Sequence, residues 1–576
     1  MLTEPQNAAP PAAAPAEEHA RRGDAFWVQG QPQRAAASYE EALRLDPDHV
    51  DARVSLGVVR ASQGKLDEAI GHWVLALKLR PDHASAHNNL GVALTEQGKL
   101  EEARASLEAA LRHQPDYAEA AYNLGVLLIK QGLRPEAIAR LEEALRLKPD
   151  HAQAYNNLGL LLNESGRPAE AAVMLAQAVR LRPSFVEAHN NLGLAYAALG
   201  RTELAEASYQ EALRLQPGQW ELHANLGNLQ TDRGRHDEGL ACYQRAVCLK
   251  PDSPARWTRA LALLANGDFE RGFPEYESRW RHTGLIERAL AQPRWDGAPL
   301  EGRTILLHVE QGLGDTLQFI RYASLAKQRG GVVVVECPVS LLPLLSRCPG
   351  IDRLVAQGSD FPEFDVHASL LSLPRLCGTT LATIPAEVQY LFPDLETVEH
   401  WRHALEAAPG LKVGIAWQGN PEYVNDRFRS VPLAEFEPLA RLPGVRLYSL
   451  QKGRGTEQLR ALAGRFEVSE LAADLDATGG AFLETAAIMK NLDLVVCSDS
   501  ALAHLAGGLG VRVWVALPAV ADWRWLRDRE DSPWYPSMRL FRQAALGAWG
   551  PVFERLADEV RKLEGQEHEV QNLAGK

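Results

Sequence analysis

The chain has 576 residues, 46% of them apolar and 23% charged, which is typical of globular protein and long enough for several domains. Its formal net charge of −13 argues against a general nucleic-acid binder, because phosphate contacts need clustered lysine and arginine. Six cysteines without a C-x-x-C pair predict a protein of the reducing cytoplasm with no structural metal. No uncharged apolar stretch is long enough to span a bilayer, so we expect no membrane span.

The first sixteen residues read MLTEPQNAAPPAAAPA. They have neither a basic start nor an unbroken apolar core, both of which a secretory signal needs. We therefore expect residues 1–16 to be a disordered tail rich in proline and alanine.

Residues 17–252 repeat with a period of 34. Leu-Gly pairs recur in register from 56–57 to 226–227, and a second glycine marks each turn in the middle of a repeat. Such a unit is two helices, in which small residues allow close approach and proline ends the second helix. The pattern resembles the tetratricopeptide repeat and predicts seven repeats stacked into an all-α superhelix. The prolines that set the period are Pro47, Pro81, Pro115, Pro149, Pro183, Pro217 and Pro251.

A column of asparagines precedes the Leu-Gly pair in five successive repeats. One interpretation is a solvated helix position. The other is a ladder of amides that binds extended peptide backbone, since an amide both donates and accepts hydrogen bonds. Similar ladders line the peptide groove of the O-linked N-acetylglucosamine transferases. Asparagine is a mediocre helix former, so its recurrence favours a peptide groove. The column consists of Asn89, Asn123, Asn157, Asn191 and Asn225.

Residues 253–300 keep a helical pattern without the Leu-Gly pair, which predicts capping helices and a linker. Short apolar runs then alternate with helical segments, as expected for parallel sheets. We expect two Rossmann-like domains, over 301–400 and 401–563, and a tail over 564–576. The strand candidates are TILLHV, GVVVVEC and FDVHAS in the first domain, and KVGIAW, VRLYSL, LDLVVCS and VRVWVAL in the second.

Three loops follow strands of these predicted sheets, where α/β proteins bind ligands. The first is Gly312-Leu313-Gly314-Asp315. The second begins Gln418-Gly419-Asn420 and continues to Arg427 and Arg429. In the third, a strand ends at Ser498 and a helix starts near Ser500, where free N–H groups and the helix dipole suit a diphosphate.

This ordered set resembles the GT-B glycosyltransferases related to bacterial heptosyltransferases, over about residues 300–563. Tetratricopeptide arms fused to such domains occur among bacterial protein glycosyltransferases, including those that modify flagellin. The resemblance implies an α/β GT-B domain that uses a nucleotide sugar and needs no metal or other cofactor. The string DLD at 474–476 is then interpreted as a surface loop and not as a metal site.

By this resemblance, Asp315 is the general base that takes the proton of an acceptor hydroxyl. The other interpretation of Asp315 is a helix N-cap, and both roles are compatible. Gly314, Asp499, Ser500, Ala501 and His504 match the donor-binding region, although His504 also fits a buried structural histidine.

The remaining donor-side candidates come from two further loops. Arg427 or Arg429 would neutralise the leaving diphosphate, unless both are surface arginines. Gln418, Asn420 and Lys452 would lie near the donor, and Lys452 follows the strand candidate VRLYSL.

The sequence thus predicts an inverting glycosyltransferase that modifies Ser or Thr of a protein held by the repeat arm. The segment 303–400 is shorter than the acceptor domain of lipopolysaccharide heptosyltransferases, which favours a protein acceptor. The alternatives are a sugar transferase of the lipopolysaccharide type, and a scaffold with an inactive transferase domain. The nucleotide of the donor is left open.

Overall fold

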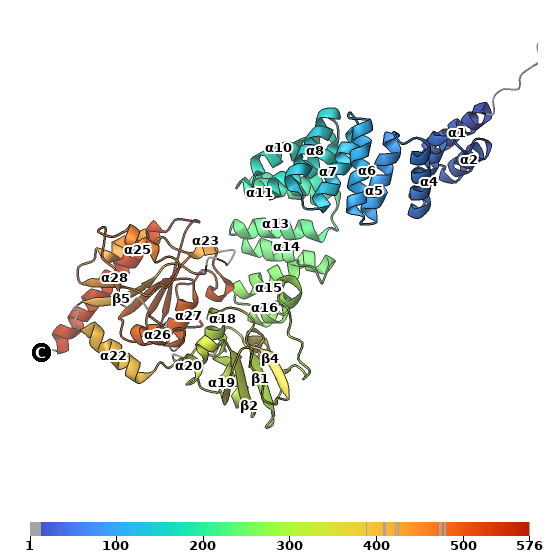
Figure 1. The fold of residues 1–576 in the computed structure, drawn as a ribbon. Coiled ribbons are helices and arrows are strands. Elements are labelled where there is room, and N and C mark those ends of the chain that lie inside the picture. Colours follow the sequence, from blue (N-terminus) through green and yellow to red (C-terminus); the bar gives the residue numbers. More distant parts are fainter. Residues whose placement is uncertain are drawn as a thin grey trace, which may run out of the picture. The chain divides into compact units, whose positions relative to one another are not determined.

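The computed structural model describes residues 13–387, 389–406, 410–420, 422, 426–471, 475–476 and 480–574. It consists of two compact units, residues 1–235 and 236–576 (Figure 1). The division lies within the seventh repeat, between its two helices. Of the expected tail, residues 1–12 lie outside the described residues, and a helix begins at Ala13.

The first unit is a row of helix pairs, one pair for each of the first six repeats, and it ends with the first helix of the seventh repeat. Glycine is required where two helices meet: a Cβ on Gly57 would lie 2.5 Å from the Trp73 ring nitrogen. The turn glycines have positive φ, such as 76° at Gly64. The helices are α1 (Ala13–Val28), α2 (Pro32–Leu45), α3 (Val50–Ser62), α4 (Leu66–Leu79), α5 (Ala84–Glu96), α6 (Leu100–His113), α7 (Ala118–Lys130), α8 (Arg134–Leu147), α9 (Ala152–Glu164), α10 (Pro168–Leu181), α11 (Val186–Ala198), α12 (Thr202–Leu215) and α13 (Trp220–Asp232).

The second unit begins with α14 (His236–Leu249), α15 (Ala255–Ala265), α16 (Phe269–Tyr276) and α17 (Arg279–His282). Residues of α16 belong to the same hydrophobic core as the strands that follow. The rings of Phe273 and Tyr276 each lie 5.8 Å from the ring of Trp523, centroid to centroid. The capping helices are therefore part of the α/β core of this unit.

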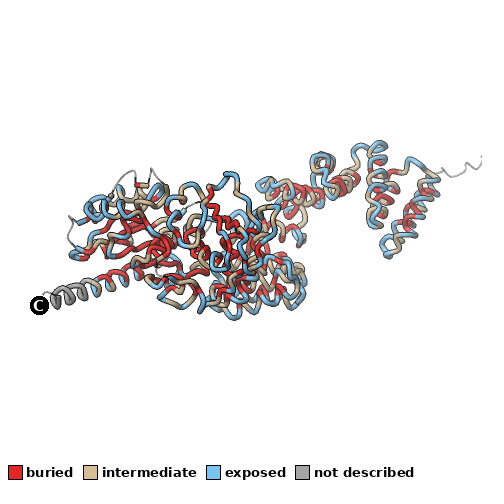
Figure 2. The backbone as a smooth tube through the Cα atoms, turned by 90° about the horizontal axis from the view of Figure 1, so that it is seen from below, coloured by how far each residue is buried: buried red, intermediate tan, exposed pale blue. Residues whose placement is uncertain are grey.

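Two parallel sheets form the rest of the second unit, and every strand candidate from the sequence is confirmed. The first sheet has the order β3-β2-β1-β4 and the second β10-β9-β8-β5-β6-β7. Their strands are largely buried. Figure 2 colours the buried stretches of the chain red. The strands are β1 (Thr304–His308), β2 (Val332–Cys337), β3 (Arg353–Ala356), β4 (Val366–Ser369), β5 (Leu411–Ala416), β6 (Val445–Ser449), β7 (Ser469–Glu470), β8 (Leu494–Ser498), β9 (Val513–Leu517) and β10 (Met538–Arg542).

Strands β3, β7 and β10 were not predicted. Strand β3 lies at one edge of the first sheet, and β7 and β10 lie at the two edges of the second. An edge strand has one neighbour and needs fewer apolar residues. In β10 the arginines Arg539 and Arg542 interrupt the apolar pattern. The signal of a continuous apolar run is therefore missing from these strands.

Short helices connect the strands, and a long one ends the chain. They are α18 (Leu313–Phe319), α19 (Tyr322–Gln328), η1 (Val339–Leu341), α20 (Leu342–Leu345), η2 (Leu370–Ser372), α21 (Leu373–Leu376), α22 (Leu395–Glu406), α23 (Asp426–Arg429), η3 (Leu433–Phe436), α24 (Glu437–Ala440), α25 (Glu457–Ala461), α26 (Leu483–Met489), α27 (Ala501–Gly508), η4 (Trp523–Trp525) and α28 (Gly550–Ala574). The last helix continues through residues 564–574 of the expected tail. Within the described ranges, no helix combines the length and the apolar character that crossing a bilayer requires.

Each sheet has a point at which the chain order reverses. In the first sheet it lies between β1 and β4, and in the second between β5 and β8. In open parallel sheets, ligands bind outside the carboxyl ends of the strands at such points. The loops after β1, β5 and β8 are the three that the sequence singled out.

Candidate functional site

The loop after β1 holds Asp315 in a fixed position. Gly312 is the N-cap of α18, and Asp315 is the third residue of the helix. Asp315 Oδ2 accepts a hydrogen bond from the Gly312 N–H at 3.2 Å. The interpretation of Asp315 as the N-cap is therefore wrong, since the N-cap lies three positions earlier. The Asp315 side chain instead caps the helix from inside its first turn.

The loop after β8 meets this turn. Ser500 is the N-cap of α27. A Cβ on Gly314 would lie 3.2 Å from His504 Cδ2 and 3.4 Å from Ala501 Cα. The helices α18 and α27 therefore pack closely at Gly314, which has no side chain (Figure 1). The fold thus brings together Gly314, Asp315, Ser500, Ala501 and His504.

The start of α27 has free hydrogen-bonding capacity. The Ser500 side chain makes no capping hydrogen bond. Among the described residues, the Oγ atoms of Ser498 and Ser500 are buried without a hydrogen-bond partner. The neighbouring Asp499 is buried, and this burial, together with Asp522, raises its pKa while Arg429 opposes the shift. Polar groups at this helix start are therefore available to a ligand.

His504 is buried among aromatic residues. Its Nδ1 lies 2.9 Å from the Tyr535 hydroxyl oxygen, and its ring stacks on Trp525 with centroids 5.2 Å apart. Burial lowers the pKa of His504 well below its ordinary value, and the cations Arg524 and Arg321 add to this. These contacts agree with the interpretation of His504 as a structural histidine that supports α27.

Arg524, which lies after β9, joins its own segment to the Asp315 turn, and the sequence analysis missed it. Its Nη2 donates to Asp315 Oδ1 at 2.5 Å, although the two residues are 209 positions apart. Its Nη1 donates to Asp522 Oδ1 and its Nε to Gln318 Oε1, both at 2.8 Å. A signal was present: Asp522-Trp523-Arg524-Trp525 sets a cation between aromatic residues just after the buried strand β9.

The loop after β5 carries several of the predicted donor-binding residues. Gln418 lies beside Gln451, whose Oε1 accepts from the Gln418 N–H at 3.0 Å. Asn420 is exposed, and its Oδ1 accepts from the Glu422 N–H at 3.1 Å within the loop. Arg429 Nε donates to Asp426 Oδ1 at 3.1 Å, and Arg429 contributes to the electrostatics of Asp499 and His504. The side chain of Arg427 lies outside the described residues.

Lys452 is engaged away from this centre. Its Nζ contacts the Leu475 carbonyl oxygen and lies 3.4 Å from Asp476 Oδ2. The sequence suggested that Asp476 belongs to a surface loop, but its side chain is buried. Its buried carboxylate accepts from the Glu484 N–H at 2.7 Å and from the Thr485 hydroxyl at 2.5 Å. Asp476 therefore caps α26, while Asp474 lies outside the described residues.

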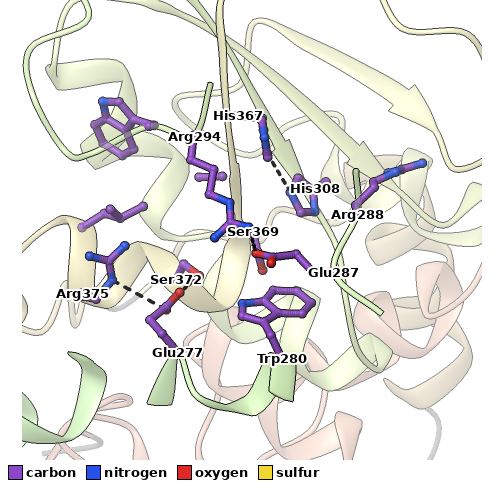
Figure 3. A pocket seen from close by; sticks show the side chains of 13 residues that line it. Glu277, Trp280, Glu287, Arg288, Arg294, His308, His367, Ser369, Ser372 and Arg375 are labelled. Atoms are coloured by element: carbon purple, nitrogen blue, oxygen red, sulfur yellow. Dashed lines mark hydrogen bonds and ion pairs between the residues drawn. The ribbon is translucent and has the colours of Figure 1, made fainter. Parts of the chain in front are cut away.

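A pocket lies at the reversal point of the first sheet (Figure 3). His308 of β1 and His367 of β4 face each other there with ring nitrogens 3.4 Å apart. Burial is the main cause that lowers the pKa of His308 to about 4, and the charges of His367 and Arg288 lower it further. The pocket is lined by Glu277, Trp280, Glu287, Arg288, Arg294, Trp295, His308, His367, Ala368, Ser369, Ser372, Arg375 and Leu376. Several of these charges are paired with each other or with neighbours: Arg294 with Glu287, Arg375 with Glu277, and Arg288 with Glu336.

A buried ion pair beneath this pocket fixes the start of the Asp315 loop. The Arg279 guanidinium is fully buried and donates to Glu310 at 2.7 and 3.0 Å. It also donates to the Ser372 hydroxyl at 2.9 Å, and the Ser369 hydroxyl donates to Glu310 at 2.5 Å. The loop between β1 and α18 is thereby tied to α17 and to the end of β4.

The asparagine column of the first unit is partly used within the arm. Four of its amides donate across to the preceding repeat: Asn123 to Asn88 at 2.9 Å, Asn157 to the Tyr122 hydroxyl at 3.3 Å, Asn191 to Asn156 at 3.0 Å and Asn225 to Asn190 at 2.8 Å. Asn89 Oδ1 accepts from Asn88 at 3.3 Å. All five side chains are half-buried. The column therefore connects successive repeats, which the sequence did not predict, and it keeps a partly exposed edge.

Comparison with known proteins identifies the repeats. Family models of the tetratricopeptide repeat match residues 21–78, 73–105, 94–159, 164–219 and 223–284. The N-terminal region is thus built of tetratricopeptide repeats, and the last match extends over the predicted capping helices.

Among curated proteins, the chain is 29% identical to Protein FlbA of Caulobacter vibrioides over 334 residues. The match covers 53% of this chain and spans about half of the relative, 54%.

Solved structures resemble parts of the chain. The repeat protein YrrB is 24% identical over 32% of this chain and 94% of its own, with a TM-score of 0.29. PilF of Pseudomonas aeruginosa is 20% identical over 38% of this chain and 98% of its own, with a TM-score of 0.36. MamA is 27% identical over 28% of this chain and 94% of its own, with a TM-score of 0.26.

Proposed function

We propose that the protein is a glycosyltransferase of the GT-B type whose tetratricopeptide arm binds a protein acceptor. The observation that carries the proposal is the contact between the Asp315 turn and the start of α27. Each loop follows a strand of a different parallel sheet, and each strand borders the reversal point of its sheet. A donor at one loop and an acceptor at the other would therefore meet between the sheets.

On the donor side, α27 would bind the diphosphate of a nucleotide sugar. The N-terminal N–H groups of the helix and its dipole favour an anion. The buried, unpartnered hydroxyl of Ser500 among the described residues supports this assignment. Arg429 is the nearby cation that would stabilise the leaving diphosphate, so that the reaction would need no metal.

On the acceptor side, Asp315 would act as general base. Its carboxylate accepts the proton of a Ser or Thr hydroxyl while that oxygen bonds to the anomeric carbon. The bond from this carbon to the diphosphate breaks, and the diphosphate leaves with the electron pair. A single displacement of this kind inverts the anomeric centre.

The arm would hold the acceptor as an extended segment along the asparagine column. The amide atoms that are not used in hydrogen bonds between repeats would pair with peptide backbone. Flagellin is one candidate acceptor, since the resemblance noted from the sequence includes enzymes that modify it.

The test is a panel of nucleotide sugars incubated with wild-type protein and with Asp315→Asn. We expect wild type to hydrolyse or transfer one sugar, and Asp315→Asn to lose about 10²–10⁴-fold in rate while donor binding by calorimetry is retained. Glu435→Gln, which changes a half-buried carboxylate in η3 outside the proposed site, is the control. Absence of binding and turnover for every donor would favour a scaffold with an inactive domain, and transfer to lipid-linked sugar alone would favour the lipopolysaccharide type.

A further inference from the structure

Arg524 reaches from the second sheet to the candidate base of the first. The geometry points to Arg524 as a positioning residue that keeps the Asp315 carboxylate ionised and oriented toward the acceptor. This inference rests on the function proposed above for Asp315.

Both oxygens of Asp315 are held by separate donors. Oδ2 accepts from the Gly312 N–H at 3.2 Å, and Oδ1 accepts from Arg524 Nη2 at 2.5 Å. Two donors on two oxygens fix the rotation of the carboxylate plane. A carboxylate has about four acceptor positions, so lone pairs remain for the acceptor hydroxyl.

Arg524 is itself immobilised. Its other nitrogens donate to Gln318 and Asp522, and its guanidinium carbon lies 4.7 Å from the centroid of Trp523. Trp523 in turn packs on Phe273 and Tyr276 of α16. Arg524 is buried, so it differs from a surface arginine that samples many rotamers.

The surroundings of Asp315 make this cation necessary. Burial raises the pKa of Asp315, Arg524 opposes this rise, and Asp522 adds to it. Without Arg524, Asp315 would lose the cation that opposes the rise of its pKa, while its burial and the neighbouring Asp522 would still favour the protonated form of Asp315. A protonated Asp315 cannot accept a proton. The other titratable or charged groups around this cluster are Tyr276 of α16, Arg321 after α18, Arg429 of α23, and Asp499 and His504 at α27.

The first test observes the protonation of Asp315 directly and needs no activity. Infrared spectra at neutral pH are compared for wild type, Arg524→Met and Arg524→Met/Asp315→Asn. We expect a protonated carboxyl band in Arg524→Met that is absent from wild type and from the double variant. The inference is overturned if no such band appears, or if the band persists with Asp315→Asn and disappears with Asp522→Asn.

The second test is the pH profile of kcat/KM for the donor found active in the panel. In Arg524→Met we expect the acidic limb to move to higher pH and the rate at neutral pH to fall about tenfold or more, with donor Kd unchanged. Arg524→Lys should restore the limb in part, because it keeps a cation. An unmoved acidic limb would contradict the inference.

Arg529→Met is the matched control, since Arg529 lies in the same segment and pairs with Asp531. It should leave both the band and the profile unchanged. An inactive wild type would count against the proposed function, whereas the infrared result would still decide the role of Arg524.

Discussion

The two units are held together by interactions of different range along the sequence. Side-chain hydrogen bonds between neighbouring repeats of the first unit join residues only tens of positions apart, from 20 for Arg60 to Glu40 to 35 for Asn123 to Asn88. In the second unit, Arg524 contacts Asp315 over 209 positions and Arg321 contacts the Trp534 carbonyl over 213. A change in the arm should therefore act locally, whereas a change in the second unit should act on the whole core.

The largest expected effect is that of Arg279→Met in the second unit. It leaves Glu310 buried without its cation, which typically costs about 3–5 kcal/mol of unfolding free energy. Chemical denaturation followed by tryptophan fluorescence measures it, because ten of the thirteen tryptophans lie after residue 235. The control is Arg281→Met, which breaks the exposed pair with Asp252 and should cost about 0–1 kcal/mol. Equal effects of both variants would refute the structural role of the buried pair.

The next effect concerns the acceptor binding that we propose for the arm. Replacement of Asn123, Asn157 and Asn191 by Ala removes hydrogen bonds worth about 0.5–1.5 kcal/mol each, so affinity for an acceptor peptide should fall tens-fold or more. The same change also removes three bonds between repeats, so thermal stability should fall as well. Peptide titration and thermal unfolding are both measured.

The matched control separates these two losses. Asn88→Ala, Tyr122→Phe and Asn156→Ala remove the partners of the same three bonds and leave the column in place. If the column binds peptide, this control loses stability but keeps acceptor affinity. Equal loss of affinity in both triple variants would mean that the asparagines act only through the structure of the arm.

A smaller, local effect is expected from glycine substitutions in the arm. A Cβ on Gly159 would lie 2.5 Å from Leu175 Cγ, and overpacking of this kind costs about 1–3 kcal/mol. Gly71 in α4 has no atom within 4 Å of such a Cβ, so Gly71→Ala should stabilise the helix by up to about 1 kcal/mol. Hydrogen exchange should accelerate only around α9 and α10 in Gly159→Ala. Acceleration throughout the second unit would contradict the local character of the arm.

The smallest expected effect is a loss of arm stability in mild acid. Burial lowers the pKa of His72, His87 and His151. The unfolded chain then binds more protons than the folded one, so stability is complete above the unfolded value of about 6.5 and decreases as pH falls below it. His151 Nδ1 also accepts from the Ala154 N–H at 3.3 Å, a cap that protonation removes.

Hydrogen exchange of α9 between neutral pH and mild acid measures this effect. His151→Asn keeps an N-cap acceptor without titration, so its exchange in α9 should depend less on pH. Identical pH dependence in wild type and His151→Asn would assign the acid sensitivity to other groups.

The sequence by itself determined the arm and the strands. The tetratricopeptide period shows where each helix begins and ends, because the same small residue, turn glycine and proline recur at every repeat. The strand candidates such as TILLH and LVVCS were visible because strands inside a parallel sheet are apolar on both faces. The strands that were missed, β3, β7 and β10, all lie at sheet edges, although the edge strand β4 was visible as FDVHAS.

Only the tertiary structure decided how the candidate site is assembled. Asp315 and His504 were found in the sequence because each belongs to a local strand–turn–helix pattern. Their contact through Gly314, and the Arg524 hydrogen bond to Asp315, depend on how two sheets pack. The bonds between neighbouring asparagine amides likewise depend on the stacking of repeats. A pairing that occurs once, between distant segments, leaves no period in a single sequence, so packing alone reveals it.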